Sequence, residues 1–372
     1  MPRLVSALAL VAVLALPARA QAQDAGCGPD ARAVRTHLST DYAGRDLLLD
    51  AGRAAALDRL VAEADAAPDE VACDSLLWTA ATLFPDGHLD VATPRRQPPS
   101  FWTARRYGPW GGELGLRFVG DSAAVLRLPS FDLSHKAAID SLIAANRERL
   151  LRTPYLVVNV QGNGGGSDDS FSALLPLILS GPVQMVDAEI VASPNNIADF
   201  EALAADPRFD DETRTWLLER IAEMRAAEPG AFVAFGGDAP EVFEPTAMPR
   251  AVALVIEGGV GSSAEELALI ARTSPKVTLV GAPTYGALDY SNVRDVPLPS
   301  GERTLHLPTT RRNWLPTSSV DDGGIRPDVT VPDGVADWDA FALGVIVAKD
   351  TAPLSPAERT FAQRAAVAFA GE

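Results

Sequence analysis

The chain has 372 residues, more than one small hydrophobic core can hold, so its length predicts two or three packed units. Its 32 basic and 49 acidic residues give a formal net charge of −17 at pH 7. Because such a chain repels phosphate polymers and anionic lipid headgroups, the composition argues against nucleic-acid binding and against polybasic docking to membranes.

Residues 1–22 are predicted to be a secretory signal peptide. Arg3 precedes an apolar run from Leu4 to Leu16, and small residues at Ala20 and Ala22 offer cleavage sites. The run is shorter than the roughly 20 residues that cross a bilayer, so cleavage is favoured over a membrane anchor and no stable membrane insertion is expected afterwards. We expect a periplasmic or secreted protein. Loss of the two arginines of the signal leaves 30 basic and 49 acidic residues, a net charge of −19.

Residues 23–94 are predicted to form a small helical domain, because their apolar positions recur at helical spacing. The two cysteines of the chain, Cys27 and Cys73, both lie here, and in an exported protein they predict a disulfide. Closing this loop would stabilise the fold by roughly 4 kcal/mol in the chain-entropy model. Two cysteines and four scattered histidines show no ligand spacing, so no metal and no cofactor are expected.

Residues 95–112, which contain RRQPPS and YGPWGG, are predicted to be a linker. From 113 to 335 short apolar strands such as YLVVNVQ alternate with helices, which indicates an α/β core with a largely parallel sheet. Within this core, 187–246 is predicted to be a helical insertion, either a lid over a site or a plain helical excursion. Residues 336–372 are predicted to end the chain as helices.

Ser262 is the first candidate for chemistry. It follows an apolar strand, opens a helix and has Glu265 three residues later, a pattern that a capping box also explains. The preceding glycines permit a tight turn that exposes the serine, and a helix N-terminus offers N–H groups to an oxyanion. The segment is not the G-x-S-x-G elbow of α/β-hydrolases.

The stretch GNGGG at 162–166 also follows a strand. It could be a flexible loop or a phosphate cradle, although it lacks the G-K-[ST] ending of the latter. A third interpretation is that one of its N–H groups faces the serine as an oxyanion donor, across the ends of two neighbouring strands.

A serine nucleophile needs a base and an acid that orients it. The segment PDGHLD places His88 in a turn, where a structural role is the alternative. The other histidines lie within regular elements and have weaker claims: His37, His135 and His306. Asp321 and Asp322 precede a glycine pair; alone they read as a turn into an edge strand, and beside a Ser–His pair they become candidate acids.

Taken in order, these segments resemble the serine peptidases that include the C-terminal processing (tail-specific) proteases and the tricorn core. VVNVQGNGGG, GGVGSSAEE, VTLVGAPTYG and DDGGIRPDVTV look like that family's D-x-R-x-N-x-G-G, G-x-x-S-A-x-E, G-x-x-T-x-G and G-V-x-P-D-x-x-V signatures. PDGHLDV looks like the D-G-H segment of many bacterial members. The resemblance implies a crotonase/ClpP-like α/β core over roughly residues 80–335 and hydrolysis of peptide bonds.

Carried over position by position, the resemblance implies that Ser262 is the nucleophile and that the N–H groups of Ser263 and Gly165 bind the oxyanion. Tail-specific proteases carry a lysine 25 residues past the serine, whereas this chain has Ala287 there and only three lysines in all. The histidine-dependent branch is therefore the better analogue, with His88 as base and Asp321, or next to it Asp322, as acid.

Two further expectations follow from the resemblance. No segment is long enough for a PDZ domain, and TYGALDYSN looks like the corresponding stretch of a lysine-lacking bacterial subgroup, in which Asp289 and Tyr290 line the site together with Glu265. An ordinary histidine base predicts that activity falls below about pH 6 to 7. The competing hypothesis is a catalytically decayed relative that binds a peptide or a hydrophobic ligand; an acyl-CoA enzyme is disfavoured, because export separates the chain from CoA.

Overall fold

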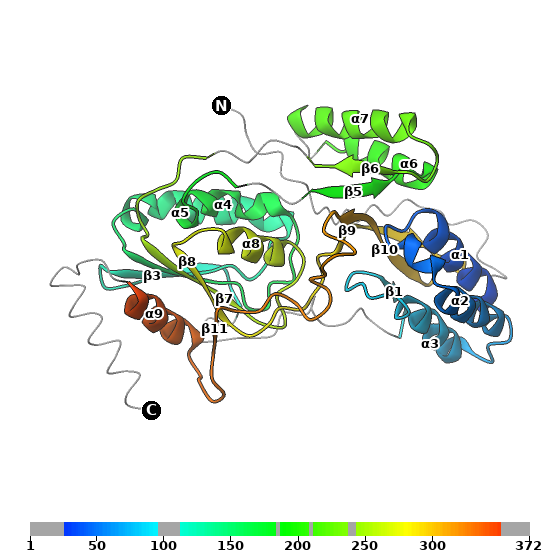
Figure 1. Cartoon of the computed structure of the whole chain (residues 1–372), viewed down its shortest axis with the longest axis horizontal. Coiled ribbons are helices and arrows are strands. Elements are labelled where there is room, and N and C mark those ends of the chain that lie inside the picture. The colour runs from blue at the N-terminus through cyan, green and yellow to red at the C-terminus, as the bar shows by residue number, and fades with distance from the viewer. Residues whose placement is uncertain (1–25, 96–111, 184–186, 208–210, 237–242, 351–372) are drawn as a thin grey trace.

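The computed structural model describes residues 26–95, 112–183, 187–207, 211–236 and 243–350. The predicted signal peptide, most of the predicted linker and the last predicted helix lie outside the described residues. Figure 1 shows an α/β body on one side and, beside it, a second sheet that carries the N-terminal helices.

A six-stranded sheet forms the centre of the α/β body. Its strands lie in the order β11 (Val329–Thr330), β8 (Val277–Gly281), β7 (Ala251–Ile256), β4 (Tyr155–Asn159), β3 (Ala123–Arg127) and β2 (Gly115–Val119). All neighbours are parallel except β2, which runs antiparallel to β3. The inner strands are covered on both faces, which explains continuous apolar runs such as AVALVI in β7. The predicted α/β fold class is confirmed.

Helices cover both faces of this sheet (Figure 1). One face carries α4 (Leu133–Leu150), η3 (Asp168–Leu174), α5 (Leu175–Ile178) and α8 (Ser263–Arg272), and the other carries α9 (Trp338–Lys349). Alternate side chains of β4 enter the two layers, as the two-residue period of a strand requires. Leu156 and Val158 pack in the cluster that contains α8, whereas Tyr155 and Val157 pack in the cluster that contains α9.

The N-terminal helices pack into a separate small unit. They are α1 (Cys27–Thr40), η1 (Arg45–Leu49), α2 (Ala51–Ala64) and α3 (Glu70–Ala81). The predicted disulfide between Cys27 and Cys73 is present and joins α1 to α3. The apolar core of this unit includes Leu305 and Leu307 of a strand far along the chain, so the helices are seated on the second sheet.

The second sheet is antiparallel throughout and differs from the prediction. It contains β1 (Asp90–Ala92), β9 (Tyr290–Pro297), β10 (Thr304–Arg312), β5 (Ala188–Val191) and β6 (Phe232–Phe235). β9 and β10 lie within the range 113–335, for which a largely parallel sheet was predicted, yet they pair in this antiparallel sheet. The segment expected to be a helical insertion contains α6 (Pro194–Ala204) and α7 (Asp211–Ala226), and also β5 and β6. β5 and β6 have four residues each, which is too short for a clear alternation of apolar and polar residues, so the helical patterns of α6 and α7 determined the prediction for this segment.

The topology brings three loops to one edge of the parallel sheet. The glycine loop follows β4, the turn before Ser262 follows β7, and the segment 282–289 follows β8. The carboxyl ends of neighbouring parallel strands share an edge, which is where α/β folds place their sites. The turn between α3 and β1 carries His88 to this edge from the N-terminal unit.

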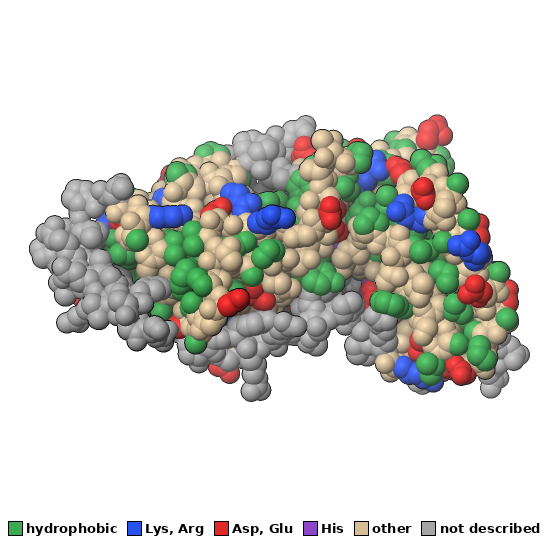
Figure 2. Space-filling view, turned by 60° about the horizontal axis from the view of Figure 1, so that its bottom comes forward, with side chains coloured by type: hydrophobic (Ala, Val, Ile, Leu, Met, Phe, Trp, Pro, Cys, Tyr) green, Lys and Arg blue, Asp and Glu red, His purple; other side chains and the backbone are tan. Residues whose placement is uncertain are grey.

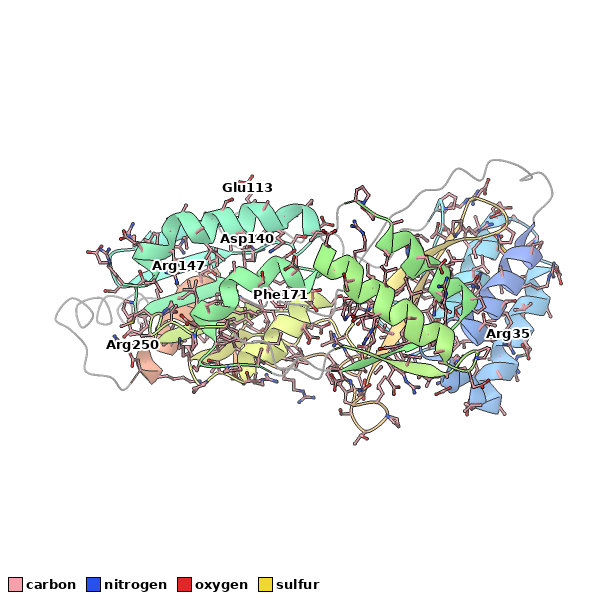
Figure 3. All side chains as sticks on the ribbon, turned by 90° about the horizontal axis from the view of Figure 1, so that it is seen from above. Arg35, Glu113, Asp140, Arg147, Phe171 and Arg250 are labelled. Carbon is pink, nitrogen blue, oxygen red and sulfur yellow. A yellow bond between two sulfur atoms is a disulfide. The ribbon has the colours of Figure 1, made fainter. Side chains whose placement is uncertain are left out.

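Charged side chains are spread over one face of the molecule (Figure 2), and the helical unit and the α/β body lie at its opposite ends (Figure 3). On the face drawn in Figure 2, acidic and basic side chains are interspersed over the elements. Figure 3 shows Arg35 of the helical unit and Arg250 of the α/β body at opposite ends of the molecule. Within the described ranges, no helix is both long and apolar enough to cross a bilayer.

Candidate active site

Ser262 stands at the start of α8 in a conformation that L-residues rarely adopt. Its backbone angles are φ 54° and ψ −127°, and among the described non-glycine residues only Asn292 also has a positive φ. Such strain persists where the surroundings hold the residue in place. Here the Ser262 N–H lies between two acceptors, Glu265 Oε2 and the Ala287 carbonyl oxygen, each at 3.1 Å.

The carboxylate of Glu265 ties the serine turn to the segment after β8. It is fully buried and accepts N–H groups from Ser262, from Gly286 at 2.9 Å and from Ala287 at 2.8 Å, as well as the hydroxyl of Thr284. Burial raises the pKa of Glu265, and these four donors act in the opposite direction. The capping interaction predicted from the sequence thus exists and also fixes the serine turn.

The glycine loop lies directly against Ser262. A Cβ at Gly165 would come within 2.6 Å of Ser262 Cβ and 3.0 Å of the Ser263 nitrogen, and φ at Gly165 is +103°, so the position requires glycine. The Ser263 hydroxyl donates to the Gly166 carbonyl at 3.0 Å and so fastens the loop to α8.

The two predicted oxyanion donors differ in their present bonding. Ser263 is the first residue of α8, so its N–H is one of the four that a helix leaves without an intrahelical acceptor. The Gly165 N–H instead donates to Asn163 Oδ1 at 2.9 Å. The structure brings both residues to Ser262, with only the Gly165 amide engaged by a neighbouring side chain.

The turn that carries His88 packs on the segment that holds Ser262. A Cβ at Gly87 would come within 2.5 Å of the Gly286 oxygen and 2.7 Å of Ala287 Cβ, and the Ala287 carbonyl accepts from Ser262 N–H. Ala287 stands where tail-specific proteases carry lysine. Gly87 lies directly against Ala287, so a longer side chain at 287 would meet the turn that carries His88.

The ring of His88 has a defined tautomer. His88 is 6% exposed, and its Nδ1 lies 2.7 Å from the Tyr290 carbonyl oxygen. Because a carbonyl oxygen can only accept, Nδ1 carries the proton and Nε2 carries the lone pair that a general base requires. Burial lowers the pKa of His88 to about 4; the Tyr290 carbonyl opposes this shift and the charge of Arg312 adds to it. The imidazole is therefore neutral at pH 7.

Asp321 reaches the His88 turn through the backbone. Its Oδ2 accepts from Gly87 N–H at 3.1 Å, and its Oδ1 accepts from Leu288 N–H at 2.7 Å and Asp289 N–H at 2.9 Å. Burial, with repulsion from Asp86 and Asp289, raises the pKa of Asp321 to about 8. The hydrogen bond at Nδ1 of His88 is thus with Tyr290, and Asp321 is bonded to the residue before the histidine.

The remaining predicted site residues have separate environments. Asp289 is 1% exposed and accepts from Trp314 Nε1 at 2.7 Å and from Val320 N–H at 2.9 Å, so it holds the segment that carries Asp321. Tyr290 contributes its carbonyl oxygen. Asp322 is exposed, and its N–H donates to the Ser319 hydroxyl. Of the two candidate acids, Asp321 is the one bonded to the His88 turn.

Sequence reasoning missed Asp86, the aspartate of PDGH. Its Oδ1 accepts from the N–H groups of His88 at 2.8 Å and Leu89 at 3.2 Å, and its Oδ2 accepts from the hydroxyl of Tyr42 at 2.8 Å. Burial raises the pKa of Asp86 to about 7, against these donors. The Asp-Gly pair was an available signal, because an aspartate commonly accepts from the backbone N–H two residues later.

The other histidines have partners elsewhere. His37 Nδ1 lies 2.6 Å from Asp41, and His306 Nδ1 lies 2.7 Å from Asp295. His135 lies in α4, beside Ser134. Across the part of the chain that the structure describes, no group of three or more His, Cys, Asp or Glu side chains could hold a metal ion.

Ser262, the glycine loop and the His88 turn therefore meet at the carboxyl edge of the parallel sheet. Comparison with protein families gives the assignment: the model described as Peptidase family S41 matches residues 122–331, more than half of the chain. The chain belongs to peptidase family S41. It is a serine peptidase, a hydrolase whose substrates are peptides or proteins, and this confirms the family and the enzyme class predicted from the sequence. The assignment does not favour the binding-protein hypothesis.

Solved structures share the fold at low identity. A structure described as that of a candidate peptidase from Parabacteroides merdae has a TM-score of 0.55 and 13% identity, covering 89% of this chain and all of its own. A lipoprotein from Streptococcus agalactiae has a TM-score of 0.50 and 13% identity, covering 85% of this chain and 95% of its own. No curated protein matches the sequence.

Proposed function

We propose that this protein is an exported serine peptidase in which Ser262 attacks the peptide carbonyl and His88 is the general base. The observation that carries the proposal is the position of Ser262. It is a strained residue at a helix start, in contact with the glycine loop on one side and hydrogen-bonded on the other to the segment on which the His88 turn packs. Strained serines at strand-to-helix turns expose Oγ for attack in other hydrolases.

In the first step His88 Nε2 takes the proton of Ser262 Oγ while Oγ bonds to the carbonyl carbon. The proton on Nδ1 stays with the Tyr290 carbonyl, which keeps the ring in the tautomer with a basic Nε2. The imidazolium then returns the proton to the leaving amine. In this proposal Asp321 is the acidic partner, and it acts by fixing the backbone of Gly87 through a hydrogen bond. Because its pKa is raised to about 8, the carboxyl is mostly uncharged at pH 7, so its part is to hold the His88 turn in place.

The oxyanion of the tetrahedral intermediate is stabilised by backbone N–H groups. Ser263 supplies one from the first turn of α8, where the helix dipole also favours negative charge. Gly165 supplies the second once its N–H leaves Asn163 Oδ1, 2.9 Å away. In this proposal Asn163 Oδ1 accepts the Gly165 N–H when no substrate is bound.

Export is supported by the predicted signal peptide and by the disulfide, since disulfides persist in oxidising compartments. The expected mature chain begins near residue 23 in the periplasm or medium. Mass spectrometry of the protein expressed with its own N-terminus measures this, and an uncleaved chain in the cytoplasm would refute export.

The catalytic assignment is tested by substitution. Ser262→Ala and His88→Ala are expected to lower peptide hydrolysis at least 10³-fold, because losing a nucleophile or its base removes the acyl-transfer route. Matched controls are Ser134→Ala and His135→Ala on α4; both should stay within about tenfold of the wild type, since neither side chain takes part in proton transfer. A fluorophosphonate should label the wild type and not Ser262→Ala. Full activity of His88→Ala would remove the histidine from the mechanism.

A further inference from the structure

Tyr42 joins the N-terminal helical unit to the segment that carries His88. It lies two residues beyond the end of α1, is fully buried, and donates its hydroxyl to Asp86 Oδ2 at 2.8 Å. The other oxygen of Asp86 accepts from the N–H groups of His88 and Leu89. A side chain just after α1 therefore fixes, through the Asp86 carboxylate, the backbone of His88.

The ring of Tyr42 supports the other attachment of His88. Its centroid lies 5.7 Å from the ring of Tyr290 and 5.4 Å from the ring of Phe84, which it meets edge-on. The carbonyl of Tyr290 accepts from His88 Nδ1 at 2.7 Å. One residue thus contacts both groups that orient the imidazole, the Asp86 carboxylate on the backbone side and Tyr290 on the ring side.

We propose that Tyr42 and Asp86 act as a positioning pair for the general base. The pair touches neither substrate nor reacting atoms; it sets the place of His88 Nε2 relative to Ser262 Oγ. This inference rests on the proposed role of His88. The rate of proton transfer depends steeply on such placement, and an error of about 1 Å can cost roughly 10²-fold.

The alternative role for Tyr42 is packing alone, and one substitution separates the two. Tyr42→Phe keeps the ring and its contacts and removes only the hydroxyl. The chain offers a matched control in Tyr155, which is equally buried and whose hydroxyl donates to Asp350 Oδ2 at 2.9 Å. Tyr155 also accepts from Arg250, which Figure 3 shows at the end of the molecule away from the helical unit.

The experiment compares the two variants on the full chain. The active sites are first counted with a fluorophosphonate, so that kcat refers to labelled enzyme only. Tyr42→Phe is expected to lower kcat roughly 10- to 100-fold with KM within about twofold of wild type, whereas Tyr155→Phe leaves both unchanged. If Tyr42 served packing alone, Tyr42→Phe, which keeps the ring, would leave kcat per active site equal to that of Tyr155→Phe.

Asp86 provides the conservative test. Asp86→Asn keeps Oδ1 as acceptor for the two N–H groups and can donate its amide to the Tyr42 oxygen, so kcat should stay within about fivefold of wild type. Asp86→Ala removes every bond and should be at least as slow as Tyr42→Phe. Adding Tyr42→Phe to Asp86→Ala should then cause no further loss, because the two residues act through one contact.

The outcomes separate this inference from the catalytic assignment. If His88→Ala is inactive while Tyr42→Phe turns over like Tyr155→Phe, the positioning pair is overturned and His88 remains the base. If His88→Ala is fully active, both proposals fall. Should Tyr42→Phe not fold, the Asp86 variants decide, since equal kcat in Asp86→Asn and Asp86→Ala would overturn the pair.

Discussion

At the scale of single residues, the environment of His88 changes the expected pH profile. An exposed histidine would lose its basicity below about pH 6 to 7, whereas burial lowers the pKa of His88 to about 4. The base works when neutral, which is above its pKa, and fails when protonated, which is below it. We therefore expect kcat/KM to hold through pH 6 and to fall near pH 4.

The measurement is kcat/KM between pH 3 and 8, with circular dichroism at each pH to exclude unfolding. If kcat/KM already falls near pH 6.5 while the protein is still folded, the carboxylates around His88 would be raising its pKa against the effect of burial. His135→Ala is the control, since a histidine outside the site should leave the profile unchanged.

Residue patterns predicted part of this site and could not predict the rest. Ser262, Gly165 and His88 stand in turns with local signals, namely a glycine run, a helix start and an Asp-Gly pair. The partner of His88 Nδ1 is a backbone carbonyl, which has no residue-type signature. Tyr42 and Asp86 are 44 positions apart, and nothing local to Tyr42 indicates that its hydroxyl meets that carboxylate.

At the scale of elements, the contact between the glycine loop and the start of α8 can be tested sterically. A Cβ at Gly165 would lie 2.6 Å from Ser262 Cβ, so Gly165→Ala must displace the loop or the nucleophile. We expect a loss of activity of roughly 10²-fold or more, with weaker fluorophosphonate labelling. Gly120→Ala is the matched control, because Gly120 also has a positive φ, +59°, but no atom lies within 4 Å of its added Cβ.

Both variants carry the cost of placing alanine at positive φ, about 1 to 3 kcal/mol in stability. Only Gly165→Ala adds a collision with Ser262. Equal activity of the two variants would mean that the loop yields without moving the serine, and the tight contact would then have no part in catalysis.

Element prediction succeeded where hydrophobic patterns are strong and failed where they are weak. The parallel strands are buried on both faces and read as continuous apolar runs, so β4 and β7 were predicted. β9 contains Ser291, Asn292, Arg294 and Asp295 and is only half-buried in its middle, so its sequence shows no strand period. Its pairing with β10, and hence the second sheet, depends on contacts distant in sequence.

At the scale of the whole molecule, the site is assembled from two bodies, and the disulfide supports the one that supplies His88. Arg303, just before β10, is 3% exposed and lies 3.1 Å from Asp30 of α1 and 2.7 Å from Asp74 of α3. Asp30 follows Cys27 by three residues and Asp74 follows Cys73 by one. The disulfide therefore holds two helices together where their carboxylates bind a buried cation of the second sheet.

Replacing both cysteines by serine is expected to reduce stability by roughly 4 kcal/mol, because the bond closes a loop with a sequence separation of 46 residues. The loss should fall first on the N-terminal helices, since the bond lies between two of them, and loosening these helices releases Tyr42 and the His88 turn. In a urea titration, the double variant should lose turnover at a lower urea concentration than it loses most of its helical signal. In the wild type, the loss of turnover and the loss of helical signal should lie closer together.

Wild type treated with reductant is the control for the substitutions themselves. Unchanged midpoints for both signals would mean that the Arg303 network holds the helices without the disulfide, and that placement of the base does not depend on the redox state of the compartment.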